Sequence, residues 1–158
     1  MRRQTHEGIA LLQKPGLSIQ DIERFQSQLV PQELPAENIF GDNVCVRVSW
    51  FKKGTMAIGA VHKRRTVSIL IKGHMSVWTP FGGLEDVRGP QITVSPAGMK
   101  RMGYAHEDTM WAVAIAVPSE IEHMDDGALW DYATVQTYAE FLSFINQRER
   151  ITDANTSE

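Results

Sequence analysis

The pattern of hydrophobic and polar residues changes along the chain and first predicts a short helix. Residues 1–17 show no clear period and end in a proline–glycine turn signal. Ser18 and Asp21 have the spacing of a capping box, and apolar residues follow at helical intervals up to Leu29. Pro31 ends this predicted helix after about three turns.

From Asn43 the chain consists of short runs rich in β-branched and aromatic residues, separated by glycine, proline and charged turns. The predicted strands lie near 44–50, 56–62, 66–72, 74–78, 84–88, 91–95, 100–105 and 109–117. About eight short strands at this spacing, with no helix between them, predict a mainly β fold: an antiparallel sandwich or barrel.

After Pro118 a helical pattern returns. An acidic start at Asp125-Asp126-Gly127 precedes apolar residues that recur on one face from Leu129 to about residue 148, before a polar tail. The sequence therefore predicts three segments: an N-terminal arm with a short helix over 1–42, a barrel over 43–117, and a C-terminal amphipathic helix with its tail over 118–158.

Strand alternation predicts which side chains share a face. His62 and Arg64 fall on one face of the 56–64 run, and Thr66 and Ser68 fall together on the next strand. The opposite face of that next strand is apolar throughout, so we expect a terminal helix or a second subunit to cover it. Homo-oligomerisation is the expectation that follows.

The chain has 158 residues and a mass of 17.8 kDa, which fits one domain. The sequence contains no run of eighteen apolar residues, so it predicts no membrane-spanning helix. No membrane partner is therefore expected. The one cysteine, Cys45, excludes an internal disulfide and a cysteine-rich zinc site, and favours a reducing, cytoplasmic setting.

The formal net charge of −3 conceals a basic centre. The segment from Lys52 to His106 carries +7, and the rest of the chain carries −10. A basic centre of this kind is typical of an anion site, a nucleic-acid face or a solvated surface. The acidic flanks oppose the approach of phosphates, so a nucleic-acid partner is disfavoured.

The turns of the predicted barrel resemble the two motifs of the cupin superfamily, G-x5-H-x-H-x3-E-x6-G and G-x5-P-x-G-x2-H-x3-N. The matching residues are Gly54, His62, Gly73 and Pro96-Ala97-Gly98. The resemblance covers about residues 43–117. It implies a jelly-roll barrel, and cupins are commonly dimers. The metal-ligand positions fall at Ala60, His62, Thr66 and Arg101.

The stretch from Ser95 to Trp111 is similar to small cupin-like proteins of tailed bacteriophages, which often carry PxGxKRxGYAxEDTxW. Those relatives typically have further histidines near the positions of Thr66 and Ile115, and this chain has neither. Of the four ligand positions only His62 keeps a metal-binding side chain, and Arg101 puts a fixed positive charge there. We therefore expect no metal and no other cofactor.

A basic and polar set replaces the metal ligands. We expect it to bind a small anionic ligand, in nucleotide-like form as one option, in the mouth of the barrel. The candidate ligand-binding residues are His62, Arg64, Thr66, Ser68, Arg101 and Tyr104, with Trp78 and Trp111 as stacking surfaces.

Structural explanations of the same residues stay open. His62 as a satisfied core histidine is one of them. Arg101 in an ion pair with Glu107 or Asp108 is another, and for Trp78 and Trp111 a place in the hydrophobic core is the favoured interpretation.

Three classes of function follow. The first is a non-metal cupin-like protein that captures a small anion, as an accessory protein in the host cytoplasm if the chain is viral. The second, ranked nearly level, is a phage structural or assembly protein that uses the barrel as an oligomerisation module, with other phage structural proteins as partners and the virion as its place. The third is an enzyme with His62 as general base and Arg101 stabilising an anionic transition state. Catalysis ranks last, because no nucleophile–base pair has convincing spacing.

Overall fold

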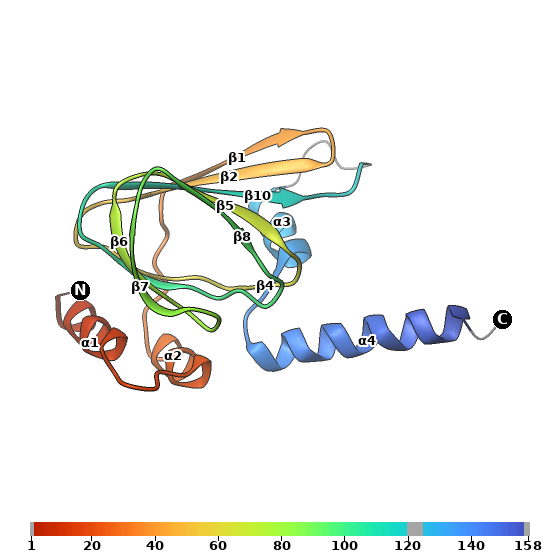
Figure 1. Ribbon diagram of the computed structural model, residues 1–158, viewed down its shortest axis with the longest axis horizontal. Helices are drawn as coiled ribbons and strands as arrows, with labels where there is room; N and C mark the ends of the chain where they lie inside the picture. Colours follow the sequence, from red (N-terminus) through yellow and green to blue (C-terminus); the bar gives the residue numbers. More distant parts are fainter. Residues whose placement is uncertain (1, 120–124, 157–158) are drawn as a thin grey trace.

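A computed structural model of the protein describes residues 2–119 and 125–156. Figure 1 shows a β-barrel, two short N-terminal helices beside it, and a long C-terminal helix that projects away from it. In the described ranges no helix is both long and apolar enough to cross a membrane.

Two antiparallel sheets form the barrel in the described residues. The first has five strands in the spatial order β1 (Ala36–Gly41), β2 (Val44–Phe51), β10 (Thr109–Ala116), β5 (Thr66–Lys72) and β8 (Gln91–Ser95). The second has four strands in the order β3 (Met56–Ile58), β9 (Met102–Ala105), β6 (His74–Thr79) and β7 (Gly83–Arg88). A short pair joins β4 (Val61–His62) to β11 (Thr134–Val135).

The chain passes back and forth between the two sheets. Strands β2, β5, β8 and β10 lie in the first sheet, and β3, β6, β7 and β9 lie in the second. This order makes a double-sheet jelly roll. The predicted fold class, a mainly β antiparallel barrel flanked by N-terminal and C-terminal helices, is confirmed.

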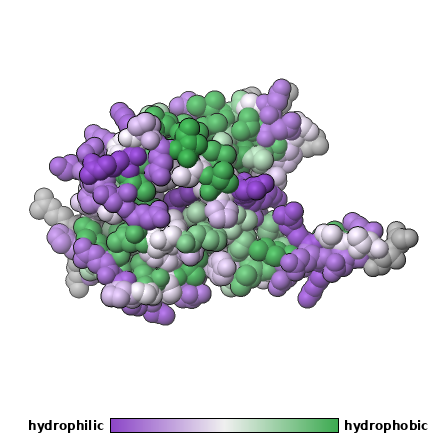
Figure 2. All heavy atoms as spheres, viewed as in Figure 1, coloured by the Kyte–Doolittle hydropathy of each residue, from purple (hydrophilic) through white to green (hydrophobic). Residues whose placement is uncertain are grey.

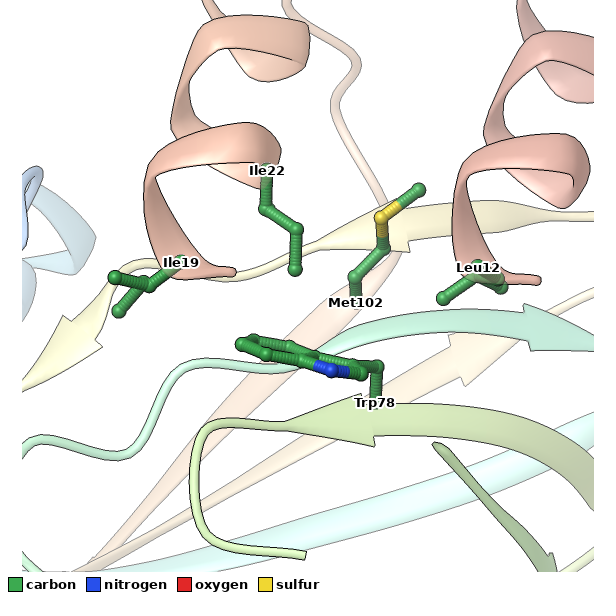
Figure 3. Close-up of a cluster of buried hydrophobic side chains, with 5 residues drawn as sticks. All are labelled: Leu12, Ile19, Ile22, Trp78 and Met102. Carbon is green, nitrogen blue, oxygen red and sulfur yellow. The ribbon is translucent and has the colours of Figure 1, made fainter. Parts of the chain in front are cut away.

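Helices α1 (Arg2–Leu12) and α2 (Ile19–Gln26) pack on the outer face of the second sheet. Figure 3 shows their side chains against two strand residues, in a cluster of Leu12, Ile19, Ile22, Trp78 and Met102. The predicted capping box is confirmed: the Ser18 hydroxyl accepts from the Asp21 backbone N–H, and the Asp21 carboxylate accepts from that of Ser18, both at 3.1 Å. Trp78 therefore lies in the hydrophobic core, which is the interpretation that the sequence favours for this residue.

Helix α3 (Asp126–Ala133) closes one end of the barrel. Its Leu129 and Ala133 pack with Cys45, Ile115 and Val117 in a second buried cluster. The side chain of Asp125 caps the helix by accepting from the Ala128 backbone N–H at 2.8 Å. The acidic start of the predicted helix is confirmed.

The single C-terminal helix predicted from Leu129 to about residue 148 is wrong. Thr134–Val135 forms strand β11, because these residues pair with β4, and a separate helix α4 (Tyr138–Thr156) follows. Helix α4 includes part of the predicted polar tail. Only its start packs on the barrel, where Phe141 is buried, and the rest projects outward (Figure 1).

Three further local predictions need correction. Residues 2–12 are helical although their sequence shows no period, because Leu12 packs on the core described above. Strand β1, within the segment expected to be an N-terminal arm with only a short helix, pairs with β2 through a turn in which Asn43 has a φ of 58°. The strand predicted over 56–62 breaks at Gly59 into β3 and β4. Met56 consequently packs on the helices while His62 faces the interior.

Gly73, in the turn between β5 and β6, is required by both conformation and space. Its φ is 111°, and an added Cβ would lie 2.6 Å from the Thr109 Cα. Gly54 is a matched control, with a φ of 87° and nothing within 4 Å of an added Cβ. We expect Gly73→Ala to lower the free energy of unfolding by about 2–5 kcal/mol and Gly54→Ala by about 1–2 kcal/mol. Urea unfolding followed by circular dichroism measures both, and equal losses would contradict the clash at Thr109.

Candidate functional site

A cavity of about 680 Å³ lies between the two sheets, and α3 borders it. This volume is in the range of small-molecule sites. The side chains that face it come from both sheets, from β4 and from α3: Arg47, Ser49, Phe51, Ile58, His62, Met75, Val77, Arg101, Trp111, Val113, Asp126 and Trp130. The connector before β1 forms part of the rim.

Backbone hydrogen bonds hold the segments of His62 and Arg101 side by side. The His62 N–H donates to the Met99 carbonyl at 2.9 Å, and the Gly98 N–H donates to the His62 carbonyl at 2.8 Å. The Gly59 N–H donates to the Arg101 carbonyl at 2.9 Å. The loop before β9 and the strand β4 therefore form one frame that aims both side chains into the cavity.

Arg101 carries the positive charge of this frame. Its Nη2 donates to the hydroxyls of Ser68, at 2.8 Å, and Ser95, and these hydroxyls are 2.9 Å apart. The guanidinium carbon lies 5.4 Å from the ring centroid of Trp111. Nε and Nη1 donate to no group in the described residues. Three N–H donors are thus left for a ligand.

No carboxylate in the described ranges neutralises Arg101. The alternative of an ion pair with Asp108 does not hold, because Asp108 Oδ1 accepts from the Lys53 backbone N–H at 2.9 Å, and no ion pair to Glu107 forms. Burial lowers the pKa of the Arg101 guanidinium to about 10, so it stays charged at neutral pH. A partly buried cation without a counter-charge is the main electrostatic feature of the cavity.

His62 lies beside Arg101 as a neutral imidazole. Burial, and then the positive charge of Arg101, lower the pKa of His62 to about 4. The side chain is 8% exposed, and its Nδ1 is buried with no hydrogen-bond partner. Its ring meets that of Trp130 edge-on with centroids 5.9 Å apart. The structural alternative of a satisfied core histidine therefore does not hold.

A second arginine, Arg47 on β2, faces the same cavity but is neutralised. Its guanidinium forms an ion pair with Asp126 of α3, donates to the Asn38 side-chain oxygen at 2.9 Å, and lies 4.6 Å from the Trp130 ring centroid. The sequence interpretation missed this group. Strand alternation was an available signal, because Arg47 shares a face with Cys45 and Ser49.

The structure brings together only part of the predicted ligand-binding set. His62 and Arg101 face the cavity, and Ser68 supports Arg101 from behind. Thr66 is buried on the same face of β5, and its hydroxyl has no hydrogen-bond partner. Trp111, favoured as a core residue, lines the cavity.

Arg64 and Tyr104 lie elsewhere. The Arg64 guanidinium donates to the Tyr132 carbonyl at 2.8 Å and lies 4.2 Å from the Tyr132 ring centroid. The predicted alternation with His62 fails there because β4 ends at His62. Tyr104 packs on the outer face of the second sheet, since its neighbour Gly103 takes the inward position.

Lys100 lies in the basic centre of the sequence and is a buried cation in the structure. Its side chain is fully buried, and Nζ donates to the Gly59 carbonyl at 2.7 Å and to Gln26 Oε1 at 2.8 Å. Burial lowers the pKa of this amine to about 8, although Glu23 opposes the shift. Lys100 ties α2 to the loop before Arg101 and points away from the cavity.

The residues present do not fit the metal site that the cupin resemblance implies. The four ligand positions hold Ala60, His62, Thr66 and Arg101, which supply one imidazole and a fixed cation. In the part of the chain that the structure describes, no three His, Cys, Asp or Glu side chains group as metal ligands.

No family model matches the sequence, and no curated protein matches it. Many solved structures resemble the chain, among them the following three. KdgF from Halomonas sp. has 14% identity and a TM-score of 0.48, with 63% of this chain and 90% of that chain covered. A protein with a double-stranded β-helix domain from Klebsiella pneumoniae has 14% identity and a TM-score of 0.47, with 66% and 85% covered. An RmlC-like cupin from Shewanella frigidimarina has 15% identity and a TM-score of 0.45, with 58% and 78% covered. The fold itself rests on the strand order described above.

The low pKa of His62 predicts an acid-dependent loss of stability. The unfolded chain takes up a proton at His62 near pH 6.5, but the folded chain does so only near pH 4. Stability should therefore fall as the pH drops through this window, by about 3 kcal/mol at pH 4 from this residue alone. Urea unfolding at pH 7 and pH 4 measures the loss. His62→Gln should lack this part of it, and an unchanged acid dependence in that variant would contradict the assignment.

Proposed function

We propose that the protein binds a small anionic ligand in the barrel cavity through Arg101, without a metal. The observation that carries this proposal is the guanidinium itself, which has no carboxylate partner in the described residues and three unused N–H donors. An unpaired charge between two sheets is costly. An anion in the cavity would remove that cost.

The supporting groups fit recognition of an anion. The hydroxyls of Ser68 and Ser95 hold the Nη2 corner of the guanidinium, so its remaining donors on Nε and Nη1 are fixed in orientation. Each of these donors suits a charge-assisted hydrogen bond to a carboxylate or phosphate oxygen. His62 adds a neutral ring beside it that can donate or accept one hydrogen bond.

The rest of the cavity favours an organic ligand over a bare ion. Phe51, Trp111 and Trp130 supply aromatic surface, and Met75 and Val77 supply aliphatic surface. A nucleotide-like ligand is one form of the proposal, with a tryptophan as the stacking surface. The resemblance to small phage proteins supports a phage accessory role in the host cytoplasm, in which the barrel sequesters such a molecule.

Catalysis with His62 as general base receives less support. A general base works best when its pKa is near the working pH, and the pKa of His62 is about 4. No hydroxyl or thiol in the described residues hydrogen-bonds to its ring. Ligand binding needs neither property.

The test is mass spectrometry of small molecules released from the protein purified from its native host. We expect one anionic compound at near-stoichiometric amount in the wild type, and its loss in Arg101→Gln. Arg88→Gln is the matched control, because Arg88 is exposed on β7, outside the cavity. Retention of the compound by Arg101→Gln, or its absence from a folded wild type, would contradict the proposal.

A second candidate function is assembly, which the outer face of the first sheet favours. On β2, β10, β5 and β8 the residues that alternate with the cavity-facing ones are apolar: Val46, Val48, Val67, Ile69, Ile92, Val94, Ala112 and Ala114. Val48 and Ala112 among them are buried by their neighbours. Ile92 and Val94 are 70% and 64% exposed. Hydrophobic residues also gather over the upper part of the barrel in Figure 2, where Figure 1 places these strands.

We propose a second copy of the chain as the occupant of this face. The described helices lie elsewhere, since α1 and α2 cover the second sheet and α3 closes the barrel end. A two-fold contact would pair the apolar residues of this face with the same residues of the second copy. None of these residues is charged, so the contact would desolvate no charged group among them. Four strands about 4.8 Å apart give a face about 15–20 Å wide, and two such sheets pack about 10 Å apart. Ala112 and Ala114 leave room for that approach. Other phage structural proteins are the alternative occupants.

Light scattering tests this assembly. We expect a wild-type dimer, and a monomer after the double substitution Ile92→Lys and Val94→Lys, which would bury charges in the contact. Leu84→Lys is the control, because Leu84 is equally apolar and 46% exposed but lies on β7 of the second sheet. A wild-type monomer at about 100 µM would contradict the two-fold contact at standard interface affinities.

A further inference from the structure

We infer that the ligand of the barrel is a monocarboxylate with an apolar or aromatic body, rather than a phosphate dianion. This inference rests on the proposed function and names the chemical class of its ligand. It comes from the charges that face the cavity, from which of them are already paired, and from the surface that surrounds them.

The two arginines of the cavity differ in what they leave for a ligand. Arg47 forms an ion pair with Asp126, donates a hydrogen bond to Asn38 and stacks on the Trp130 ring. Arg101 has only neutral hydroxyl partners. The interior of the cavity therefore offers one positive charge that the described residues do not balance.

The other titratable groups near the cavity do not add a second positive charge. His62 is neutral above about pH 5, because its pKa is about 4. The Lys100 ammonium is held by Gly59 and Gln26 and does not line the cavity. Glu33 is exposed at the rim and adds negative charge there. A second negative charge on the ligand would meet no partner and would be repelled at the entrance.

A carboxylate matches the charge of Arg101. The unused N–H donors on Nε and Nη1 lie on different edges of the guanidinium, and either can donate a charge-assisted hydrogen bond to a carboxylate oxygen. One unit of negative charge then balances one unit of positive charge. A phosphate monoester carries about −1.5 to −2 at neutral pH, so part of its charge would be desolvated without compensation.

The remaining surface selects the body of the ligand. Apart from the charged and polar groups of the lining, several side chains that line the cavity are apolar or aromatic: Phe51, Ile58, Met75, Val77, Trp111 and Val113. A polar sugar would leave its hydroxyls without partners against these side chains. An aryl or alkyl group gains by leaving water there.

Three small probes test the inference by titration calorimetry with the full chain. Phenylacetate carries one charge, phenylacetamide carries none, and phenyl phosphate is largely a dianion at pH 7.5. We expect phenylacetate to bind at least about tenfold more tightly than either of the others at pH 7.5. Phenyl phosphate should gain affinity at pH 5.5, where the monoanion dominates, while phenylacetate changes little.

Asp126→Asn supplies the decisive variant, because it keeps the side-chain shape and leaves Arg47 charged without a carboxylate partner. We expect phenyl phosphate to gain at least about tenfold on phenylacetate in this variant. Tighter binding of the dianion than of phenylacetate by the wild type, or no change of preference in Asp126→Asn, would overturn the inference while the proposed function stands. Equal binding of charged and neutral probes, insensitive to Arg101→Gln, would overturn both.

Discussion

The placement of the Arg101 guanidinium between two largely apolar sheets is the constraint on which the interior of this barrel depends. A cation in that position needs oriented dipoles, and the Ser68 and Ser95 hydroxyls on neighbouring strands supply them. The same charge keeps His62 neutral, together with burial. It also leaves a metal ion no place among the residues present. One side chain thus determines the electrostatics of the whole cavity.

Most of the architecture follows from local sequence patterns. The glycine and proline turns delimit the strands, and the alternation on β5 predicts which side chains are buried. The capping residues Ser18 and Asp21 fix the start of α2. The patterns fail where tertiary contacts decide the structure. Helix α1 depends on the contact of Leu12 with the core around Trp78, and the break between α3 and α4 depends on the pairing of Thr134 with His62, far away in the chain.

In the cavity, too, local sequence patterns predict some features, and long-range contacts decide others. Strand alternation puts Ser68 in the candidate set, and the resemblance carried by the Pro96–Gly98 turn puts Arg101 there. In the structure Arg101 donates to the Ser68 hydroxyl, and His62 and Arg101 both line the cavity. Local spacing cannot predict that Arg47 pairs with Asp126, because the two residues are 79 positions apart. It also misplaces Arg64, since nothing in the local sequence shows that β4 ends after two residues. The net charge of the cavity depends on these long-range pairs, so the number of unbalanced positive charges in the cavity could not be predicted from the sequence.

The helices outside the barrel also contribute to the rigidity of the cavity. An added Cβ at Gly98 would lie 2.7 Å from the Phe141 ring of α4, so the turn before Arg101 rests directly on that helix. Lys100 ties the next part of the same loop to α2. The loop that carries the cation is thus held in place from two sides by elements outside the cavity. For the proposed ligand, such preorganisation would lower the entropy cost of binding.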